Sequence, residues 1–308
     1  MKLCTECFVA VLVLLSGNGV LAEGWPSFRG NSNLTGVASG HLPDSLSVLW
    51  SFEIDDPIES TATVDDKSVY FGGLDSKVYA LDWMTGDVRW VLELGDEVKA
   101  SPTLSDSLVL LGDESGNFTA ADRTTGEKVW STATDGGIQS SASIQGDNVV
   151  FGSYDNHLYC LKMSTGELVW KVETDGYVHA TPAIRDGLAF AAGCDGLFRG
   201  VNVETGAEEI SIPLNDYVAS SPGFIGDVAY VGTFGNQVLA VDVEKKEIVW
   251  RYENTERLFP FYGSPAVTPE GIYIGGRDKL VHALDPASGK ELWTYSAGAR
   301  VDSSPVVV

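Results

Sequence analysis

Tryptophan recurs along this chain at intervals of about 40 residues, and this repeat restricts the possible folds more than any other feature. In the segment Leu158–Lys171, a Thr165-Gly166 turn joins two short apolar runs, and the second run ends near Trp170. Position 210 continues the series as Ile, and the last step is 43 residues. The tryptophans are Trp50, Trp90, Trp130, Trp170, Trp250 and Trp293. A period of about 40 residues is typical of propellers and solenoids.

Each repeat contains four short apolar segments that are separated by turn residues. In the first repeat these segments are Thr61–Val64, Val69–Gly73, Val78–Asp82 and Val88–Leu92. Short segments rich in β-branched and aromatic residues, bounded by Gly and Asp, predict strands. Four strands in about 40 residues form one propeller blade. We therefore expect an all-β propeller of four-stranded blades, with six complete repeats and partial ones at both ends.

A small residue stands ten positions before every repeat anchor after the first. These residues are Ala80, Ala120, Cys160, Gly200, Ala240 and Ala283. Six small residues in succession indicate that a bulky side chain packs over the backbone at this point. The anchor indole is the expected partner, because aromatic side chains gain most from burial between closely packed sheets.

The motif Ala80-Leu81-Asp82…Thr85-Gly86…Trp90 resembles the tryptophan-docking motif of the quinoprotein alcohol dehydrogenase family. More broadly, residues from about Val48 to Val308 resemble the PQQ-like repeat of eight-bladed propellers, a superfamily that includes BamB-like proteins. The resemblance implies a closed ring in which each Trp locks two blades. The dehydrogenases of this family hold PQQ against a vicinal disulfide with a bound calcium. No Cys-Cys pair follows residue 22, so we expect no cofactor and keep PQQ with calcium as the alternative.

The chain divides into three parts. Residues 1–22 resemble a secretory signal peptide, with an apolar run Phe8–Leu15 and small residues before Ala22. No Cys follows the expected cleavage site, so the signal lacks a lipobox, and we predict a periplasmic or secreted bacterial protein. Residues 23–47 form an extension that we expect on the surface of the repeats, and residues 48–308 carry the repeats. Val48–Ile54 and Ser303–Val308 supply only two strands of one more blade. This predicts that the chain is truncated at its C-terminus and that the full-length protein has seven or eight blades.

Charge and cysteine content limit the classes of partner. The net charge of -23 argues against nucleic acid and anionic membranes, and no further membrane-spanning segment occurs after the signal. Cys160 and Cys194 remain after cleavage. An exported protein could pair them, but Cys160 occupies a small, buried repeat position, so the pairing stays open.

The chain contains no recognisable catalytic motif, and its four histidines lack metal-ligand spacing. One position of the repeat varies instead, just before the first strand of each blade, where the links reach the mouth of the central channel. The residues at this position are Glu59, Lys99, Gln139, His179, Ala219, Tyr262 and Asp302. One link is three residues longer and carries Leu258, Phe259 and Phe261, which we expect to be exposed as a contact surface.

These observations favour an exported, non-catalytic binding or scaffolding module that receives an unknown protein or small ligand at the channel mouth. Two alternatives remain. One is a PQQ-dependent, quinoprotein dehydrogenase-like enzyme, and the other is a BamB-like envelope-assembly factor that binds peptide segments.

Overall fold

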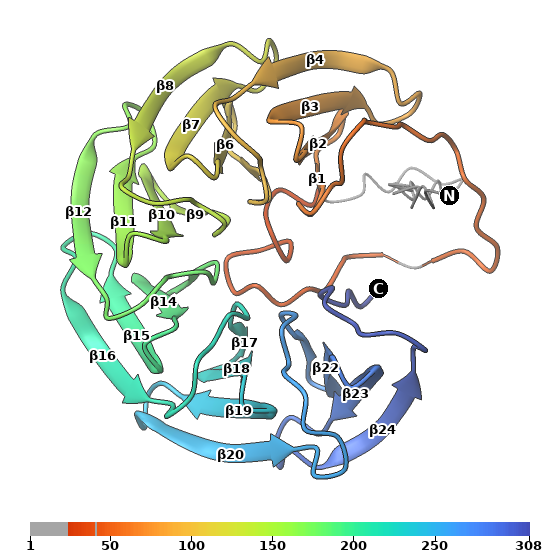
Figure 1. Ribbon diagram of the computed structural model, residues 1–308, viewed down its shortest axis with the longest axis vertical. Coiled ribbons are helices and arrows are strands. Elements are labelled where there is room, and N and C mark those ends of the chain that lie inside the picture. Colours follow the sequence, from red (N-terminus) through yellow and green to blue (C-terminus); the bar gives the residue numbers. More distant parts are fainter. Residues whose placement is uncertain (1–23, 41) are drawn as a thin grey trace, which may run out of the picture.

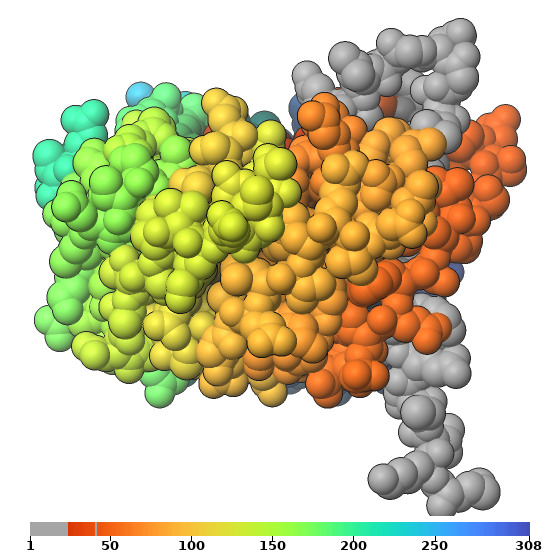
Figure 2. Space-filling model, turned by 90° about the horizontal axis from the view of Figure 1, so that it is seen from above, coloured from red at the N-terminus to blue at the C-terminus, as the bar shows by residue number. Residues whose placement is uncertain are grey.

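The computed structural model describes residues 24–40 and 42–308, so the expected signal peptide lies outside the described residues. Six four-stranded antiparallel sheets form an open ring, and the C-terminal end of the chain lies at its open side (Figure 1). Seen edge-on, successive blades lie directly against one another (Figure 2). The prediction of an all-β propeller with six complete repeats is therefore confirmed.

Every sheet has its strands in sequence order, from the innermost strand to the outermost. The first three blades are β1 (Thr63–Val64), β2 (Ser68–Gly72), β3 (Lys77–Asp82), β4 (Val88–Glu93); β5 (Thr103–Leu104), β6 (Leu108–Gly112), β7 (Asn117–Asp122), β8 (Lys128–Ala133); and β9 (Ser143–Gln145), β10 (Asn148–Ser153), β11 (His157–Lys162), β12 (Leu168–Glu173). The next three are β13 (Ala183–Arg185), β14 (Leu188–Ala192), β15 (Leu197–Asn202), β16 (Glu208–Pro213); β17 (Gly223–Ile225), β18 (Val228–Gly232), β19 (Gln237–Asp242), β20 (Glu247–Glu253); and β21 (Ala266–Thr268), β22 (Gly271–Gly275), β23 (Leu280–Leu284), β24 (Glu291–Ser296).

The core lies between the faces of neighbouring sheets. The second strands, such as β6 and β10, are buried at every residue. Both of their faces are covered by adjacent blades, which explains why their sequences are continuous apolar runs instead of alternating ones. The outermost strands, such as β12, are largely exposed, and Trp170 is the buried residue of that strand.

Each docked tryptophan joins its own blade to the next one. The Nε1–H of Trp90 donates to the carbonyl of Arg123 at 3.0 Å, and that of Trp170 donates to Val203 at 2.8 Å. The indole of Trp90 packs on Gly126, whose φ is +73°, and a Cβ there would lie 2.6 Å from the ring. Only glycine fits both the left-handed backbone and this close approach.

The small residue ten positions before each anchor lies in the same sheet as that anchor. Ala80 pairs across the sheet with Tyr70 on one side and Trp90 on the other. The Tyr70 and Trp90 rings meet over it, with centroids 5.8 Å apart. A larger side chain at position 80 would separate these two rings.

Trp293, which we predicted to dock between two blades, lies at the open side of the ring. Trp293 is 48% exposed, because no seventh sheet follows β24 among the described residues to receive its indole. The segments Val48–Ile54 and Ser303–Val308, which we predicted as strands and which the structure describes throughout, form no strand. Trp50 nevertheless packs on Gly86 and donates to the carbonyl of Trp83 at 3.0 Å.

The N-terminal extension does not lie on the outer surface, as we expected, but crosses the centre of the ring (Figure 1). We call residues 24–38 the plug. Its carbonyls accept hydrogen bonds from the inward N–H groups of the innermost segments, which have no neighbour within their own blade. Six equivalent positions are bound in this way, at 2.7–3.0 Å: Val64, Leu104, Ile184, Phe224, Val267 and Val307.

The plug is anchored by two buried side chains. Leu34 is 1% exposed and packs in the cluster between the fourth and fifth blades. Arg29 is 2% exposed and donates to the carbonyl of Pro265 at 2.8 Å. Burial lowers the pKa of Arg29 to about 10. This segment carries no periodic signal that could have predicted its path, because it belongs to no repeat.

Residues 24–40 and 42–308 include no helix with the length and apolar character needed to cross a membrane.

Candidate functional site

A belt of hydroxyl groups ties the blades together around the axis. The backbone N–H of one link donates to the Ser or Thr hydroxyl that is equivalent to it in the next blade, at 2.8–3.1 Å. The belt runs Thr61, Ser101, Ser141, Thr181, Ser221, Ser264 and Ser304. Because a buried N–H needs an acceptor, this contact requires a hydroxyl in every repeat.

A cavity of about 330 Å³ opens directly beside this belt, and we call it the cup. The residue two positions before each belt hydroxyl contributes to its lining. All seven variable positions line it: Glu59, Lys99, Gln139, His179, Ala219, Tyr262 and Asp302. Phe28 of the plug also lines the cup, and sequence reasoning missed it. A concave site of this size suits a small ligand or a side chain of a partner.

The link that is three residues longer than the others is only partly exposed. Phe261, which we predicted to be exposed, is buried. Leu258 and Phe259 are 69% and 50% exposed, but Phe261 is 2% exposed. Phe261 packs against Tyr252 and His282, with ring centroids 6.3 and 5.1 Å away. Phe261 packs against Gly232 at the end of β18. At other links a valine or isoleucine fills this place, as Val98 does against Gly72. None of these three link residues lines the cup.

A tyrosine in the turn between the second and third strands of the third blade organises the neutral wall of the cup. The hydroxyl of Tyr154 lies 2.9 Å from Gln139 Oε1 and 2.7 Å from His179 Nδ1. The His179 ring meets the Tyr262 ring edge-on, with centroids 5.7 Å apart. Burial lowers the pKa of His179, so this side chain is neutral at pH 7. Tyr154 comes from the β10–β11 turn, and its place beside the link was not visible in the sequence.

Two of the charged residues in the cup, Lys99 and Asp302, are held by ion pairs. Lys99 Nζ lies 3.3 Å from Glu97 and 3.4 Å from Glu114. Burial opposes the charge of Lys99, but these two carboxylates raise its pKa overall. Asp302 binds Arg277 at 2.7 Å and Arg300 at 3.2 Å.

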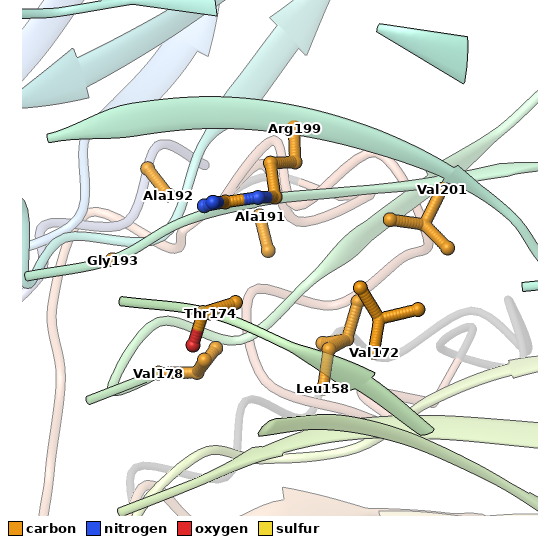
Figure 3. Close-up of a pocket in the computed structure, with 9 residues that line it drawn as sticks. All are labelled: Leu158, Val172, Thr174, Val178, Ala191, Ala192, Gly193, Arg199 and Val201. Atoms are coloured by element: carbon orange, nitrogen blue, oxygen red, sulfur yellow. The ribbon is translucent and has the colours of Figure 1, made fainter. Parts of the chain in front are cut away.

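A second cavity lies between the third and fourth blades and is too small for a ligand. Its volume is about 10 Å³, and apolar residues such as Leu158, Val172 and Val201 line it (Figure 3). Arg199 reaches its edge, where Asp195 and Glu208 hold the guanidinium. A space of this size holds about one water molecule.

The residues present do not fit a calcium-bound quinone. Cys160 and Cys194 are both unpaired thiols, and they are not adjacent in sequence. Across the described part of the chain, no three His, Cys, Asp or Glu side chains converge as metal ligands would. We therefore derive no chemistry through such a cofactor.

The ring of four-stranded sheets, the docked tryptophans and the axial cup define a PQQ-like β-propeller protein. The family described as "Outer membrane protein assembly factor BamB" matches residues 42–152, 119–209 and 236–308, more than half of the chain. The chain belongs to this family. A curated relative, the serine/threonine-protein kinase AfsK of Streptomyces griseus, is 34% identical over 77 residues. That stretch is 24% of this chain and only 10% of the kinase.

Solved structures share the fold at low identity. BamB from Moraxella catarrhalis superimposes with a TM-score of 0.74 at 22% identity, over 87% of this chain and 85% of its own. A europium-containing methanol dehydrogenase gives 0.80 at 12% identity, over 92% and 87%. The computationally designed Ika8 protein gives 0.75 at 15% identity, over 97% and 90%. At these identities the likeness establishes the fold alone.

Proposed function

We propose that this protein is a binding module that receives a ligand, or a side chain of a partner protein, in the cup. One observation carries the proposal: all seven links place the same strongly variable position around one cavity. The belt hydroxyls two residues away are uniform, since they hold the blades together. The cup residues differ in charge, size and hydrogen-bonding character, as a site with a specific occupant requires.

A fragment panel on the intact protein tests this proposal. Cationic, neutral and anionic aromatic fragments are screened by saturation-transfer NMR against the wild type and against the double variant Lys99→Ala/His179→Ala. We expect at least one fragment to bind the wild type and to lose binding in the double variant. The matched control is Lys128→Ala/His157→Ala, which changes the same residue types away from the cup.

If no fragment binds, or if binding survives equally in both double variants, the cup is not the binding site. The melting temperature of the cup variant should stay close to that of the wild type, because Lys99 and His179 lie outside the packed core and such polar substitutions usually change stability by about 0.5 kcal/mol or less. A large fall in melting temperature would show that these residues hold the fold instead.

A second candidate is a role in envelope assembly, through a partner protein that contacts the same face. The family description and the exposed Leu258 and Phe259 favour it. Replacing both residues by Ser should then abolish capture of an assembly partner while fragment binding in the cup persists. A periplasmic or secreted location is part of both candidates, and detection of the protein only in the cytoplasm would contradict it.

A quinoprotein dehydrogenase is the less favoured alternative, since the cup lacks the ligands that a quinone and calcium would need. Addition of PQQ with calcium should leave the melting temperature unchanged, because a ligand stabilises the native state only by binding it. A calcium-dependent rise in melting temperature would promote the enzyme over the binding module.

A further inference from the structure

We infer that the cup binds an organic cation, an ammonium or guanidinium group, with the Glu59 carboxylate and the Nε2 atom of His179 as its acceptors. This inference rests on the proposed binding function. It adds the chemical class of the ligand, which neither the family nor the fold assigns.

Glu59 supplies the negative charge in the cup that no protein cation neutralises. Asp302 is bound by Arg277 and Arg300, at 2.7 and 3.2 Å. Lys99 is bound by two carboxylates. Among the described residues, Glu59 has no ion pair and no hydrogen bond, although it lines the cavity. A cationic group can therefore approach this carboxylate without first displacing a basic side chain.

The second acceptor follows from the proton count at Tyr154. A tyrosine hydroxyl has one proton, and here the amide oxygen of Gln139 accepts it. The hydroxyl oxygen must then accept from Nδ1–H of His179, 2.7 Å away. In a neutral imidazole this arrangement leaves the lone pair on Nε2. No described residue donates to that atom. Tyr154 is thus a positioning residue, which keeps His179 in the acceptor tautomer.

Aromatic rings next to these acceptors also favour a cation. Tyr262 and His179 meet in the wall, and Phe28 completes the lining. The face of Tyr262 already attracts one cation of the protein, since the Arg277 guanidinium carbon lies 4.7 Å from its centroid. Aromatic faces attract ammonium and guanidinium groups through the quadrupole of the ring. The net charge of -23 adds a long-range attraction of cations toward the whole molecule.

Three charge variants of one probe test the inference. Benzylamine, benzyl alcohol and benzoate share a ring and differ in charge, and their dissociation constants are measured by NMR titration at pH 7.5. We expect benzylamine to bind at least 10-fold more tightly than the other two. Glu59→Gln should weaken benzylamine at least 10-fold. Glu127→Gln removes the same charge from a remote turn and should weaken it less than 2-fold.

Tyr154→Phe tests the positioning role. Without the phenol oxygen, Nδ1–H of His179 loses its acceptor, so benzylamine should weaken several-fold while its pH profile shifts. In the wild type, affinity should fall only at a pH below the ordinary histidine value of about 6.5, because burial lowers the pKa of His179 and a protonated His179 repels the ligand. His179→Gln should remove this fall. The other groups that face His179 or Tyr154 are Tyr177, Tyr262, Cys194 and Glu114, and none of them changes from neutral to cationic.

A free amine and a lysine of a partner peptide would present the same group. A peptide with one central Lys and the same peptide with that lysine acetylated separate these sources. A cup that binds peptides should bind the charged peptide more tightly than both the acetylated peptide and benzylamine.

Tight binding of benzoate or benzyl alcohol that is lost in the Lys99→Ala/His179→Ala variant would contradict a cationic ligand and leave the proposed binding module intact. Equal effects of Glu59→Gln and Glu127→Gln would overturn it too. No binding of any probe would overturn both proposals.

Discussion

The joints between blades and the cup are built from the same repeat, yet they follow opposite rules. At the joint after the third blade, Trp170 is 8% exposed and meets a glycine and a carbonyl of the next blade. Trp90, Trp130 and Trp250 make the same contacts at three other joints, whereas Ile210 takes the place of the indole at the joint after the fourth blade. In the cup, the position of His179 is filled by seven different residues.

The difference shows what keeps a repeat uniform. A joint residue faces the next copy of the same repeat, so its partner has the same shape at every joint. A cup residue faces the open space on the axis, where no neighbour selects a particular side chain. Joint residues should therefore determine stability, and cup residues should determine binding.

Removal of a joint tryptophan should have the largest effect on stability. Trp170→Ala deletes a buried indole and its hydrogen bond to Val203, and we expect a loss of about 3–5 kcal/mol in the free energy of unfolding. Trp293→Ala, at the open side of the ring, should cost less than about 1 kcal/mol. Urea unfolding compares the two, and equal losses would contradict the docking role.

The glycine that receives the indole should come next. In Gly206→Ala the new Cβ would lie 2.8 Å from Trp170 Cγ, at a φ of +73°. Gly187 has a φ of +80°, and a Cβ added there would meet no atom within 4 Å, so Gly187→Ala carries only the backbone strain. We expect about 1 kcal/mol for Gly187→Ala and about 2–3 kcal/mol for Gly206→Ala. Calorimetric melting of both variants would show whether the indole contact adds to the strain.

Loss of one belt hydroxyl should have a smaller but measurable effect. Ser141→Ala leaves the buried N–H of Ser101 without its acceptor, which should cost about 1–3 kcal/mol. Ser107→Ala changes an exposed residue and should stay within about 0.5 kcal/mol. If chemical denaturation finds the two equal, the belt does not stabilise the ring.

The smallest expected effect concerns the cup and depends on pH. Burial lowers the pKa of His179 in the folded state, whereas the unfolded side chain titrates near 6.5. Below this pH the unfolded state binds the proton more readily, so the contribution of His179 to stability is full above about 6.5 and falls as pH decreases. We expect His179→Gln to reduce the loss of stability between pH 7 and 5. Identical pH dependence in both proteins would contradict a buried, neutral imidazole.

Much of the fold could be predicted because the blades are local. Strands such as β2 and β3 pair with their sequence neighbours, so the apolar runs and the turn residues between them are sufficient to define a blade. The cup positions were predictable for a related reason: Lys99 and His179 interrupt a pattern that is otherwise regular. Phe28 escaped prediction because it belongs to no repeat. Tyr154 occupies a position that every repeat shares, but its bond to His179 depends on how the turn and the link meet in the folded blade.

The amino-acid sequence alone specifies the blade, the tryptophan joints and the set of residues around the axis, since each depends on a pattern that recurs about every 40 residues. Four features became apparent only in the folded ring: the path of the plug, the burial of Phe261, the exposure of Trp293 and the bond of Tyr154 to His179. These features depend on which surfaces meet when the ring forms. A repeat specifies contacts between equivalent positions, and it carries no information about a segment outside the repeats or about the places where one repeat departs from the others.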